Sequence, residues 1–460
     1  MDKVFASVTA LSQEEVLLLH RSSLRILEDI GLQVPNERML AMLSGIGCRV
    51  TASQVRFPAA LIEEMVQDLR GAAGPAQKNS LEPVTGSVST QVFLVDDRLG
   101  TRRKGRLDDI LKGIALTERL DHFPAPDAIV VPSDVPAQYA DLMGYYAMFV
   151  YSAKPGGTYV TNPDMALPII RMAEIAGRQA GFLLDTVSPL RVNPQSLEMA
   201  LLFADHGMPV SFASLATAMT TAPVTAAGAL ALLNAEHLAG LVMLRLLGMK
   251  PRYYPGMVHA ADPGSLLCSF GAPFIARTAL ACAQLARFYG LIPYGNIALT
   301  DALQPDFQAG FEKTLSFVLG MCAGVKAIGC QGIVGADQGI SLEQLVIDNA
   351  WLSVWNDLVG GLEISEETIG LDAIRAAGIG GAFIDQEYTL RHYARELRRP
   401  GLFRCLGWDS ARVPLLEQAH ELVVQYTKGY QERAFVVDRH QKKALDAVVA
   451  EAGQGSLPLF

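Results

Sequence analysis

The sequence predicts an α/β fold of the TIM type: a (β/α)8 barrel with a helical N-terminal extension and a helical C-terminal region. Between residues 90 and 340, short apolar runs alternate with helical stretches at near-regular spacing, which favours seven parallel strands and a barrel closed by an eighth. An open doubly wound sheet is the second choice, and the absence of GxGxxG after a strand weakens its dinucleotide-binding version. We expect the extension in residues 1–85, the barrel in 86–340 and the helical region in 341–460.

The N-terminal extension begins with a capped helix at residues 11–34. Ser12 precedes an acidic first turn, and Glu15 follows three residues later, as in a capping box. Apolar residues recur on one face of this helix, and Gly31 is a good C-terminal stop. The rest of the extension predicts helices at 36–46 and 59–69, a short strand at 55–58 and a loop at 71–86.

The barrel strands are expected where short apolar or β-branched runs stand between helices. An eighth strand is less certain, because QVFLVD (91–96) either closes the barrel or forms a hairpin over one end. The seven other candidates are AIVVP (128–132), GTYVTN (157–162), LLDTVS (183–188), PVSFASL (209–215), RYYPGMV (252–258), IPYGNIAL (292–299) and AIGCQGIV (327–334).

The C-terminal region, from residue 341 to about 450, is expected to be mostly helical and is the most polar part of the chain. One of its helices ends at the Pro-Gly break of RHYARELRRPG (391–401). This region packs on the barrel, mediates self-association or docks a partner, and the sequence leaves the three roles open.

Composition predicts a cytoplasmic protein that binds neither nucleic acid nor a membrane. The chain has 38 basic and 47 acidic residues, a net charge of −9, and no strong basic block. The longest apolar stretch, 222–247, is interrupted by Asn234, Glu236, His237 and Arg245. The six cysteines are dispersed without CxxC, and HExxH is absent, so we expect buried reduced thiols and no side-chain metal site.

Side chains at the carboxyl ends of barrel strands face the active site. Here these ends are rich in amides and hydroxyls and poor in carboxylates, which suits the orientation of a small polar ligand better than acid–base chemistry. Tyr253 and Tyr254 are adjacent on one strand, so one is expected to face the barrel, where its ring would contact a cation, or to pack in the core. The strand-end candidates are Asn162, Ser188, Arg191, Asn193, Ser214, Tyr254, His259, Asn296, Asp301, Gln331 and Gln338.

Four of these candidates have competing structural roles. His259 contacts a ligand or is a satisfied core histidine. Asn296 is poor strand material, which favours a ligand role. Gln331 interrupts a buried strand, where an unpaired amide is costly. Arg191 clamps a substrate carboxylate or pairs with Asp185.

Several blocks, in order and spacing, resemble the trimethylamine methyltransferase (MttB-like) family over nearly the whole chain. The opening LHRSSLRILEDIGLQV with VRFPAALIEEMV is similar to that family's first helix and hairpin. The later blocks are MTTAPVTAAGALALLNAEHLAGLV (219–242), FGAPFIARTALACAQLARFYGL, PYGNIALTDALQPDFQAGFEK (293–313), SLEQLVIDN (341–349) and GLEISEETIGLDAI (361–374).

The resemblance implies a barrel enzyme that presents a methylated amine to the cobalt of a separate corrinoid protein. Trimethylamine enzymes of this family carry pyrrolysine near the segment that reads IALTDA (297–302) here, where this chain has only standard residues. Family members without pyrrolysine use quaternary amines such as glycine betaine, proline betaine or carnitine. A quaternary ammonium already carries a neutral amine as its leaving group, so position and desolvation suffice when Co(I) is the nucleophile.

Under this resemblance the strand-end residues take expected roles in a non-pyrrolysine, possibly glycine betaine, methyltransferase. Phe93 and Tyr254 would form an aromatic cage, and Asn296, Gln331, Gln338, His259 or Arg191 would donate to a betaine carboxylate. The chain lacks a DxHxxG corrinoid motif, so the corrinoid should belong to the partner protein. The alternatives are a non-catalytic betaine-binding protein and an unrelated small-molecule barrel lyase or decarboxylase. A homo-oligomer is compatible with all three.

Overall fold

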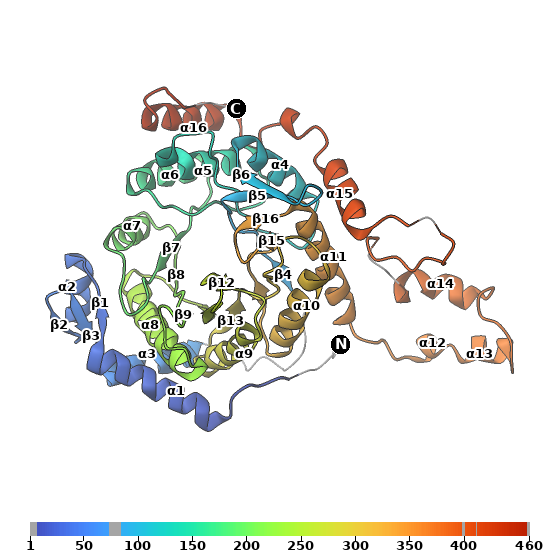
Figure 1. Ribbon diagram of the computed structural model, residues 1–460, viewed down its shortest axis with the longest axis horizontal. Helices are drawn as coiled ribbons and strands as arrows, with labels where there is room; N and C mark the ends of the chain where they lie inside the picture. Colours follow the sequence, from blue (N-terminus) through green and yellow to red (C-terminus); the bar gives the residue numbers. More distant parts are fainter. Residues whose placement is uncertain (1–6, 73–83, 398–400, 411, 458–460) are drawn as a thin grey trace.

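The computed structural model describes residues 7–72, 84–397, 401–410 and 412–457. Helices and short strands are mixed, and the strands lie around a common centre with helices outside them (Figure 1). This arrangement follows from the alternation of short apolar runs with longer amphipathic stretches. The mixed helix and strand architecture expected from the sequence is therefore confirmed.

Parallel pairing links the strands around this centre. β7 (Phe182–Asp185) pairs with β8 (Val210–Ala213), and a bridge from Ser214 to Gly256 extends the series to β10 (Tyr253–Pro255). β10, β13 (Ile292–Gly295), β14 (Ala327–Ile328) and β4 (Thr85–Gly86) then pair in that order, all parallel.

The series continues beyond β4 through single contacts. Gln91 bridges Val130 in parallel, and the Ala128 amide donates to the Gly157 carbonyl at 2.8 Å. These pairings place eight chain segments side by side, with residues 84–91 as the segment that the sequence left uncertain. A fully closed (β/α)8 barrel is a stronger statement than these pairings make, and it stays a prediction.

Several strand expectations need correction. The expected loop at 71–86 contains β4, and QVFLVD forms β5 (Phe93–Asp96), which makes an antiparallel hairpin with β6 (Thr101–Lys104). AIVVP and GTYVTN give only a bridge and a single hydrogen bond instead of regular strands. AIGCQGIV is broken into β14 and β15 (Ile333–Val334), because Cys330 (φ 64°) and Gly332 (φ 80°) adopt left-handed backbone conformations that turn the chain.

The helices outside the strands begin at ordinary capping signals. Asn162, Asn193, Thr225, Asp306 and Ser341 each accept a backbone hydrogen bond at a helix N-terminus. These helices are α4 (Leu107–Glu118), α5 (Ala140–Tyr151), α6 (Pro163–Ala176), α7 (Pro194–Asp205), α8 (Ala226–Leu246), α9 (Pro273–Phe288), α10 (Phe307–Cys322) and α11 (Leu342–Leu358), with a 3₁₀ turn at Ala137–Tyr139 before α5.

Within the described residues, α8 alone is long and apolar enough to cross a bilayer. In its most apolar window, 89% of the residues are buried inside the protein, as in a core helix. Its central position explains why it is apolar on all sides.

The N-terminal extension confirms the expected capping box. The Glu15 amide donates to the Ser12 hydroxyl at 3.2 Å, and the Ser12 amide donates to the Glu15 carboxylate at 2.7 Å. Gly31 follows the helix with φ 81°, a conformation that a side chain would strain. The extension consists of α1 (Gln13–Arg25) with a π-helical end at Ile26–Ile30, β1 (Leu32–Gln33), α2 (Glu37–Gly45), β2 (Arg49–Thr51), β3 (Gln54–Arg56) and α3 (Ala59–Ala72).

Two small sheets follow the carboxyl ends of the parallel strands and form a rim. β9 (Thr217–Ala218), β11 (His259–Ala261) and β12 (Cys268–Ser269) make the first sheet. β15 and β16 (Gly339–Ile340) join the hairpin of β5 and β6 in the second. Any ligand that enters from this side must pass between them.

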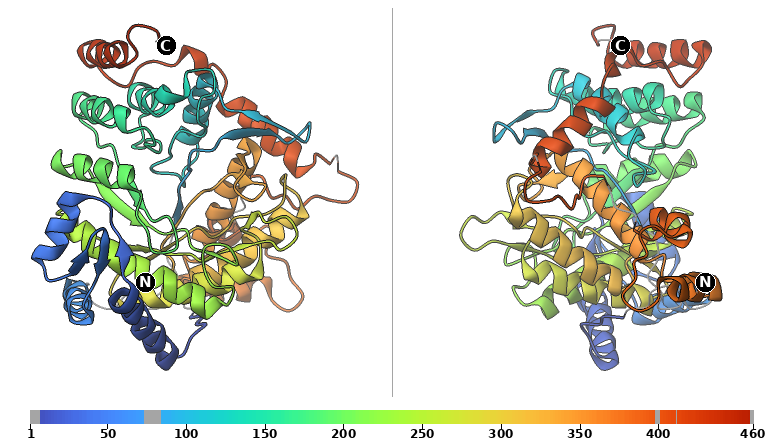
Figure 2. Two further views of the ribbon diagram at one scale, coloured as in Figure 1. Left: turned by 60° about the vertical axis from the view of Figure 1, so that its left-hand side comes forward. Right: turned by 90° about the vertical axis from the view of Figure 1, so that its right-hand side faces the viewer.

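The C-terminal region divides into a packed part and a projecting part. α15 (Leu415–Tyr426) packs on α11, and α16 (Arg439–Ala452) packs on α6. The segment with α12 (Glu366–Ile369), α13 (Leu371–Ala377) and α14 (Glu387–Glu396) stands away from the body (Figures 1 and 2). A 3₁₀ turn, Tyr430–Glu432, lies between α15 and α16. The expected division at residues 85 and 340 stays a prediction.

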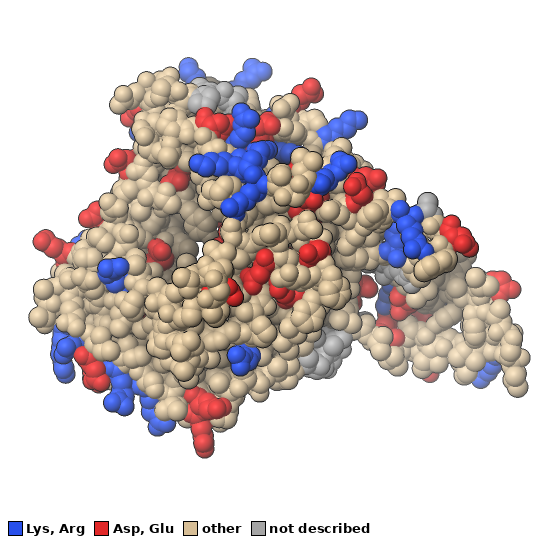
Figure 3. Space-filling model, viewed as in Figure 1, with Lys and Arg blue, Asp and Glu red and all other residues tan. Residues whose placement is uncertain are grey.

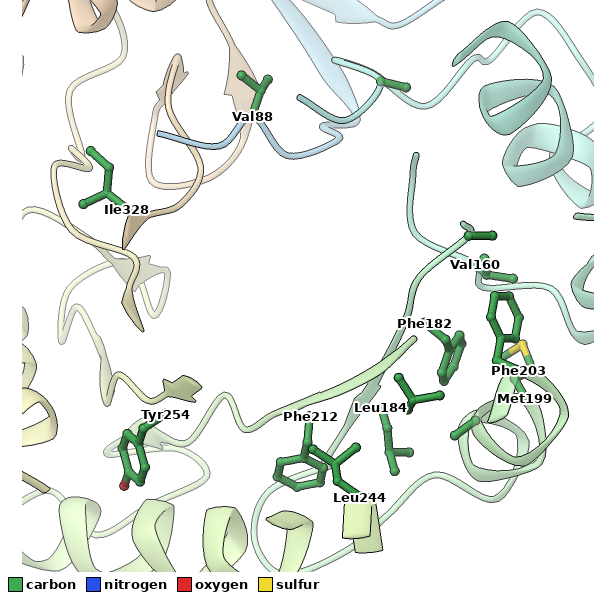
Figure 4. Packing of buried hydrophobic residues seen from close by; sticks show 14 of the residues in the cluster. Val88, Val160, Phe182, Leu184, Met199, Phe203, Phe212, Leu244, Tyr254 and Ile328 are labelled. Carbon is green, nitrogen blue, oxygen red and sulfur yellow. The ribbon is translucent and has the colours of Figure 1, made fainter. Parts of the chain in front are cut away.

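The main core lies between the strands and the outer helices. Phe182 and Leu184 of β7 point to Phe203 and Met199 of α7, and Phe212 of β8 points to α8 (Figure 4). Because strand side chains alternate, the residues between them point to the centre.

Candidate functional site

The inward-facing side chains form a surface that we call the inner wall, comprising Ser87, Ser89, Tyr159, Ser211, Tyr253, Tyr294, Asn296 and Cys330. The alternation is plain on β8 and β10: Ser211 and Tyr253 are exposed, whereas their neighbours Phe212 and Tyr254 are buried. The inner wall is therefore accessible to water and rich in hydroxyl and aromatic groups.

Tyr253, Tyr294 and Tyr159 supply the aromatic groups. The Tyr253 and Tyr294 rings meet edge to face, with centroids 6.3 Å apart and planes at 75°. The Tyr294 hydroxyl lies 3.4 Å from the Ser87 hydroxyl, and burial raises the pKa of Tyr294 to about 12. Tyr159 is 44% exposed, yet burial raises its pKa well above the ordinary value. A ring that water reaches although protein surrounds it lines a recess rather than an outer surface.

Gly329 fixes the position of two inner-wall side chains. A Cβ atom on Gly329 would lie 2.5 Å from the Tyr294 hydroxyl and 2.4 Å from the Asn296 amide oxygen. The Gln331 amide donates to the Gly329 carbonyl at 2.9 Å. The backbone at Gly329 thus allows a close approach that any larger residue would prevent, and it brings two of the expected residues, Asn296 and Gln331, to one place.

Cys330 adds a thiol to the inner wall, close to Ser89. The two side chains lie 3.2 Å apart between Sγ and Oγ. Burial raises the pKa of Cys330 to about 12, so the group is a neutral thiol at physiological pH and a poor nucleophile. This part of the wall suits binding better than covalent catalysis.

A buried carboxylate closes the ends of β7 and β8. Glu236 of α8 accepts hydrogen bonds from the Thr186 hydroxyl at 3.0 Å, the Ser188 hydroxyl at 2.7 Å and the Leu190 amide at 2.6 Å, and also from the Ser214 hydroxyl. These donors satisfy the charge without a cation. The expected strand-end residues Ser188 and Ser214 therefore meet at Glu236, where they join two strands to α8.

The remaining expected residues lie elsewhere. Tyr254 is buried against α8, and its hydroxyl donates to Asn234 at 2.9 Å, so its ring does not face the centre and the cage assignment must be corrected in favour of Tyr253. His259 lies buried in the rim against Phe270, with ring centroids 5.1 Å apart. Its Nδ1 has no hydrogen-bond partner, and burial lowers its pKa to about 4, so the imidazole is neutral.

Phe93 and Gln338 come together on the rim instead of on the inner wall. Arg102 of β6 lies over the Phe93 ring at 4.4 Å, and its guanidinium donates to the Gln338 side chain. Arg191 is exposed, and Asp185, its expected partner, accepts instead from the Ser196 hydroxyl at 3.4 Å. The sequence missed Tyr159 and Tyr294, although alternation within GTYVTN and IPYGNIAL could have placed both inward.

The remaining strand-end candidates have local structural contacts. Asn162 and Asn193 cap α6 and α7, and Asp301 accepts from the Ser269 hydroxyl at 2.5 Å and from the Phe270 amide at 2.6 Å. Acidic side chains lie near the middle of the face in Figure 3, with Lys and Arg gathered above them. The electrostatic field beside the centre therefore favours a cationic ligand.

An ion pair stiffens the protein behind β14. Lys313 of α10 and Asp348 of α11 are both buried, with 3.1 Å between Nζ and Oδ2. Asp348 also accepts from the Gly332 amide and the Gln344 side chain, both at 2.8 Å. The pair holds the turn after Cys330 against two helices, and so positions this side of the inner wall.

Comparisons with known proteins identify the family. The family model for trimethylamine methyltransferase (MTTB) matches residues 1–452. The chain is 25% identical to a glycine betaine methyltransferase of Desulfitobacterium hafniense (strain Y51) over 477 residues, covering 99% of each protein. It is 28% identical to the trimethylamine methyltransferase MttB of Methanosarcina thermophila over 462 residues, covering 93% of this chain and 94% of that one.

Among solved structures, the monomethylamine methyltransferase (MtmB) of Methanosarcina barkeri is similar with a TM-score of 0.42 and 9% identity, covering 100% of this chain and 97% of that one. The family match extends over nearly the whole chain and agrees with the ordered blocks of the sequence. The chain belongs to the trimethylamine methyltransferase family.

Proposed function

We propose that this chain transfers a methyl group from a quaternary amine of the glycine betaine type to the Co(I) corrinoid of a separate corrinoid protein. A TIM-type barrel would hold the amine at its centre. The observation that carries the proposal is the inner wall, which offers tyrosine rings, hydroxyls and amides to one water-accessible recess. It is supported by the standard residues IALTDA at 297–302, where pyrrolysine is expected in the trimethylamine enzymes.

The inner wall suits a permanent cation. Tyr159, Tyr253 and Tyr294 would surround the ammonium with electron-rich faces, an attraction of about 0.5–2 kcal/mol for each well-placed ring. Asn296 and Gln331 lie beside the rings at Gly329 and would donate to a carboxylate at the other end of the ligand. A betaine carries both charges, so this wall matches it better than an uncharged amine.

The reaction asks little acid–base chemistry of the protein. The carbon–nitrogen bond breaks, its electron pair leaves with the amine, and a neutral tertiary amine departs without a proton. The corrinoid supplies the electron pair that forms the new bond to the methyl carbon. The chain's own residues would bind the cation, orient one N-methyl group to the opening and exclude water. The neutral His259 and the neutral Cys330 fit a site that moves no proton.

The test mixes the full chain anaerobically with reduced corrinoid and, separately, glycine betaine, proline betaine, carnitine and trimethylamine. We expect loss of the Co(I) absorption together with one equivalent of demethylated amine for a betaine, and little of either for trimethylamine. If betaine binds tightly in calorimetry but is never demethylated, the chain is a binding protein. If no amine binds or reacts, the proposal is wrong.

A further inference from the structure

The segment of residues 360–397, which we call the arm, lacks a core of its own. Every residue in it is described, and none is buried. Eleven large apolar side chains in the arm are exposed, among them Leu362 (85%), Ile384 (87%) and Ile379, which is fully exposed. Monomers rarely expose apolar surface on this scale, so an arm of this composition requires a covering surface.

A second uncovered apolar surface lies on the outer side of α10. Phe307 and Phe311 are exposed at one helical turn's spacing, Phe307 to 89%. With Gly310, Thr314 and Leu315 they line an open groove of about 440 Å³ that no charged side chain enters. We call this surface the α10 groove. It suits an apolar helix or loop and offers no specific site for a charged ligand.

From these two surfaces we infer that the chain forms a two-fold dimer in which the arm of each copy covers the α10 groove of the other. A surface and its complement on one chain are both covered at once by a two-fold axis, and such closed pairs are the commonest homo-oligomers. The arm extends from the end of α11 away from the body, as an exchanged segment must (Figures 1 and 2).

The size of the arm agrees with a stable dimer. Specific interfaces bury about 1,200–2,000 Å² in total and use roughly 20–30 residues on each side. The arm contributes residues 360–397, nearly all of them exposed, and the groove adds its five lining residues. Two reciprocal contacts of this kind therefore reach the range of permanent dimers.

The first test measures mass by sedimentation velocity and light scattering at micromolar concentration. We expect about twice the 49.5 kDa of one chain. Ile384→Asp in the arm and Phe311→Asp in the groove should each weaken the dimer at least tenfold. Leu18→Asp is the matched control, because Leu18 is also an exposed leucine, on α1; it should leave the mass unchanged. A wild-type monomer at these concentrations would overturn the proposal.

Mixing the variants tests the reciprocal contact itself. A dimer of one Ile384→Asp chain and one Phe311→Asp chain keeps one contact fully wild-type, whereas each variant alone has no intact contact. The mixture should therefore dimerise more tightly than either variant alone. If it does not, the arm and the groove do not meet, and the proposal is wrong even if the protein is a dimer. The readout is mass, so neither result depends on the proposed methyl transfer.

A cross-link distinguishes exchange between chains from closure within one chain. In a Cys405→Ser background, Ile384→Cys and Phe311→Cys together should give a disulfide-linked dimer on a non-reducing gel. Cys405 is replaced because it is exposed. A disulfide formed only within single chains would overturn the exchange and would show that the arm folds back on its own body.

Discussion

The two faces of the parallel strands differ in almost every physical property. On β8, Phe212 is buried against α8, whereas the adjacent Ser211 is exposed to the centre. On β10, Tyr254 donates its hydrogen bond to Asn234 of α8, whereas Tyr253 contacts Tyr294 on the inner wall. The comparison indicates that the outer face carries the stability of the protein and that the inner face is free to bind a ligand. Four predictions test this division.

The largest effect is expected from Lys313→Met on the outer side. The change leaves Asp348 buried without its cation, and breaking a buried pair in this way typically lowers the free energy of unfolding by about 3–5 kcal/mol. Thermal and denaturant unfolding measure the loss. Lys313→Met combined with Asp348→Asn is the control: the amide still accepts from the Gly332 amide, so most of the stability should return. A single variant as stable as wild type would show that the pair is not structural.

The next effect compares neighbours on one strand. Phe212→Ala removes a buried ring that touches Gly240 of α8, and the cavity should cost about 3–5 kcal/mol. Ser211→Ala, one residue away on the inner face, should change stability by less than about 0.5 kcal/mol. Matched unfolding curves are the measurement. Equal losses at the two positions would abolish the proposed division between the faces.

Local signals made much of the fold predictable. Ser12, Glu15 and Gly31 act through neighbours in the chain, so the first helix and its ends follow from the sequence. The turn that breaks AIGCQGIV does not, because Cys330 is a non-glycine residue whose left-handed backbone is imposed by contacts with distant segments. The same is true of β4, where a pair of residues becomes a strand only because β14 lies beside it.

The site was less predictable than the fold. Amide-rich strand ends correctly drew attention to Asn296 and Gln331, which meet at Gly329, although their role in binding stays a prediction. Phe93 and Gln338 follow strand-like runs, but the chain turns into a hairpin there, and Arg102 holds both on the rim. Whether Tyr253 or Tyr254 faces inward depends on register, which one sequence does not specify.

The third prediction moves to the inner wall and rests on the proposed function. Tyr294→Leu keeps apolar bulk but removes the ring, so betaine binding should weaken roughly 5- to 30-fold, equivalent to about 1–2 kcal/mol of cation attraction. The melting temperature should stay within about 2 °C of wild type, because this ring faces the recess. Calorimetry with glycine betaine gives the affinity, and Tyr294→Phe, which keeps the ring, is the matched control. Unchanged binding in Tyr294→Leu would remove this ring from the site.

The smallest effect is expected at the rim, which belongs to neither face. Burial raises the pKa of Asp97 to about 7 from its ordinary 3.8, with further increases from the nearby Glu343 and Asp96, while the Ser341 hydroxyl opposes the shift. Glu343 also contacts His420 of α15 at 2.8 Å. Because the folded protein holds the Asp97 proton more tightly than the unfolded chain, this group favours folding below pH 4, and its contribution is lost as the pH rises through 7.

Asp97→Asn should therefore flatten the decline in stability between about pH 4 and 8 and stabilise the protein at pH 8 by about 1 kcal/mol. The gain is modest because the amide accepts the Ser341 hydrogen bond less strongly than a carboxylate does. Denaturant unfolding across this pH range is the measurement. Asp96→Asn at the exposed neighbour should keep the wild-type pH profile. An Asp97→Asn profile parallel to wild type would mean that Asp97 remains ionised in the folded protein, and that the rim, like the inner wall, tolerates charge because water reaches it.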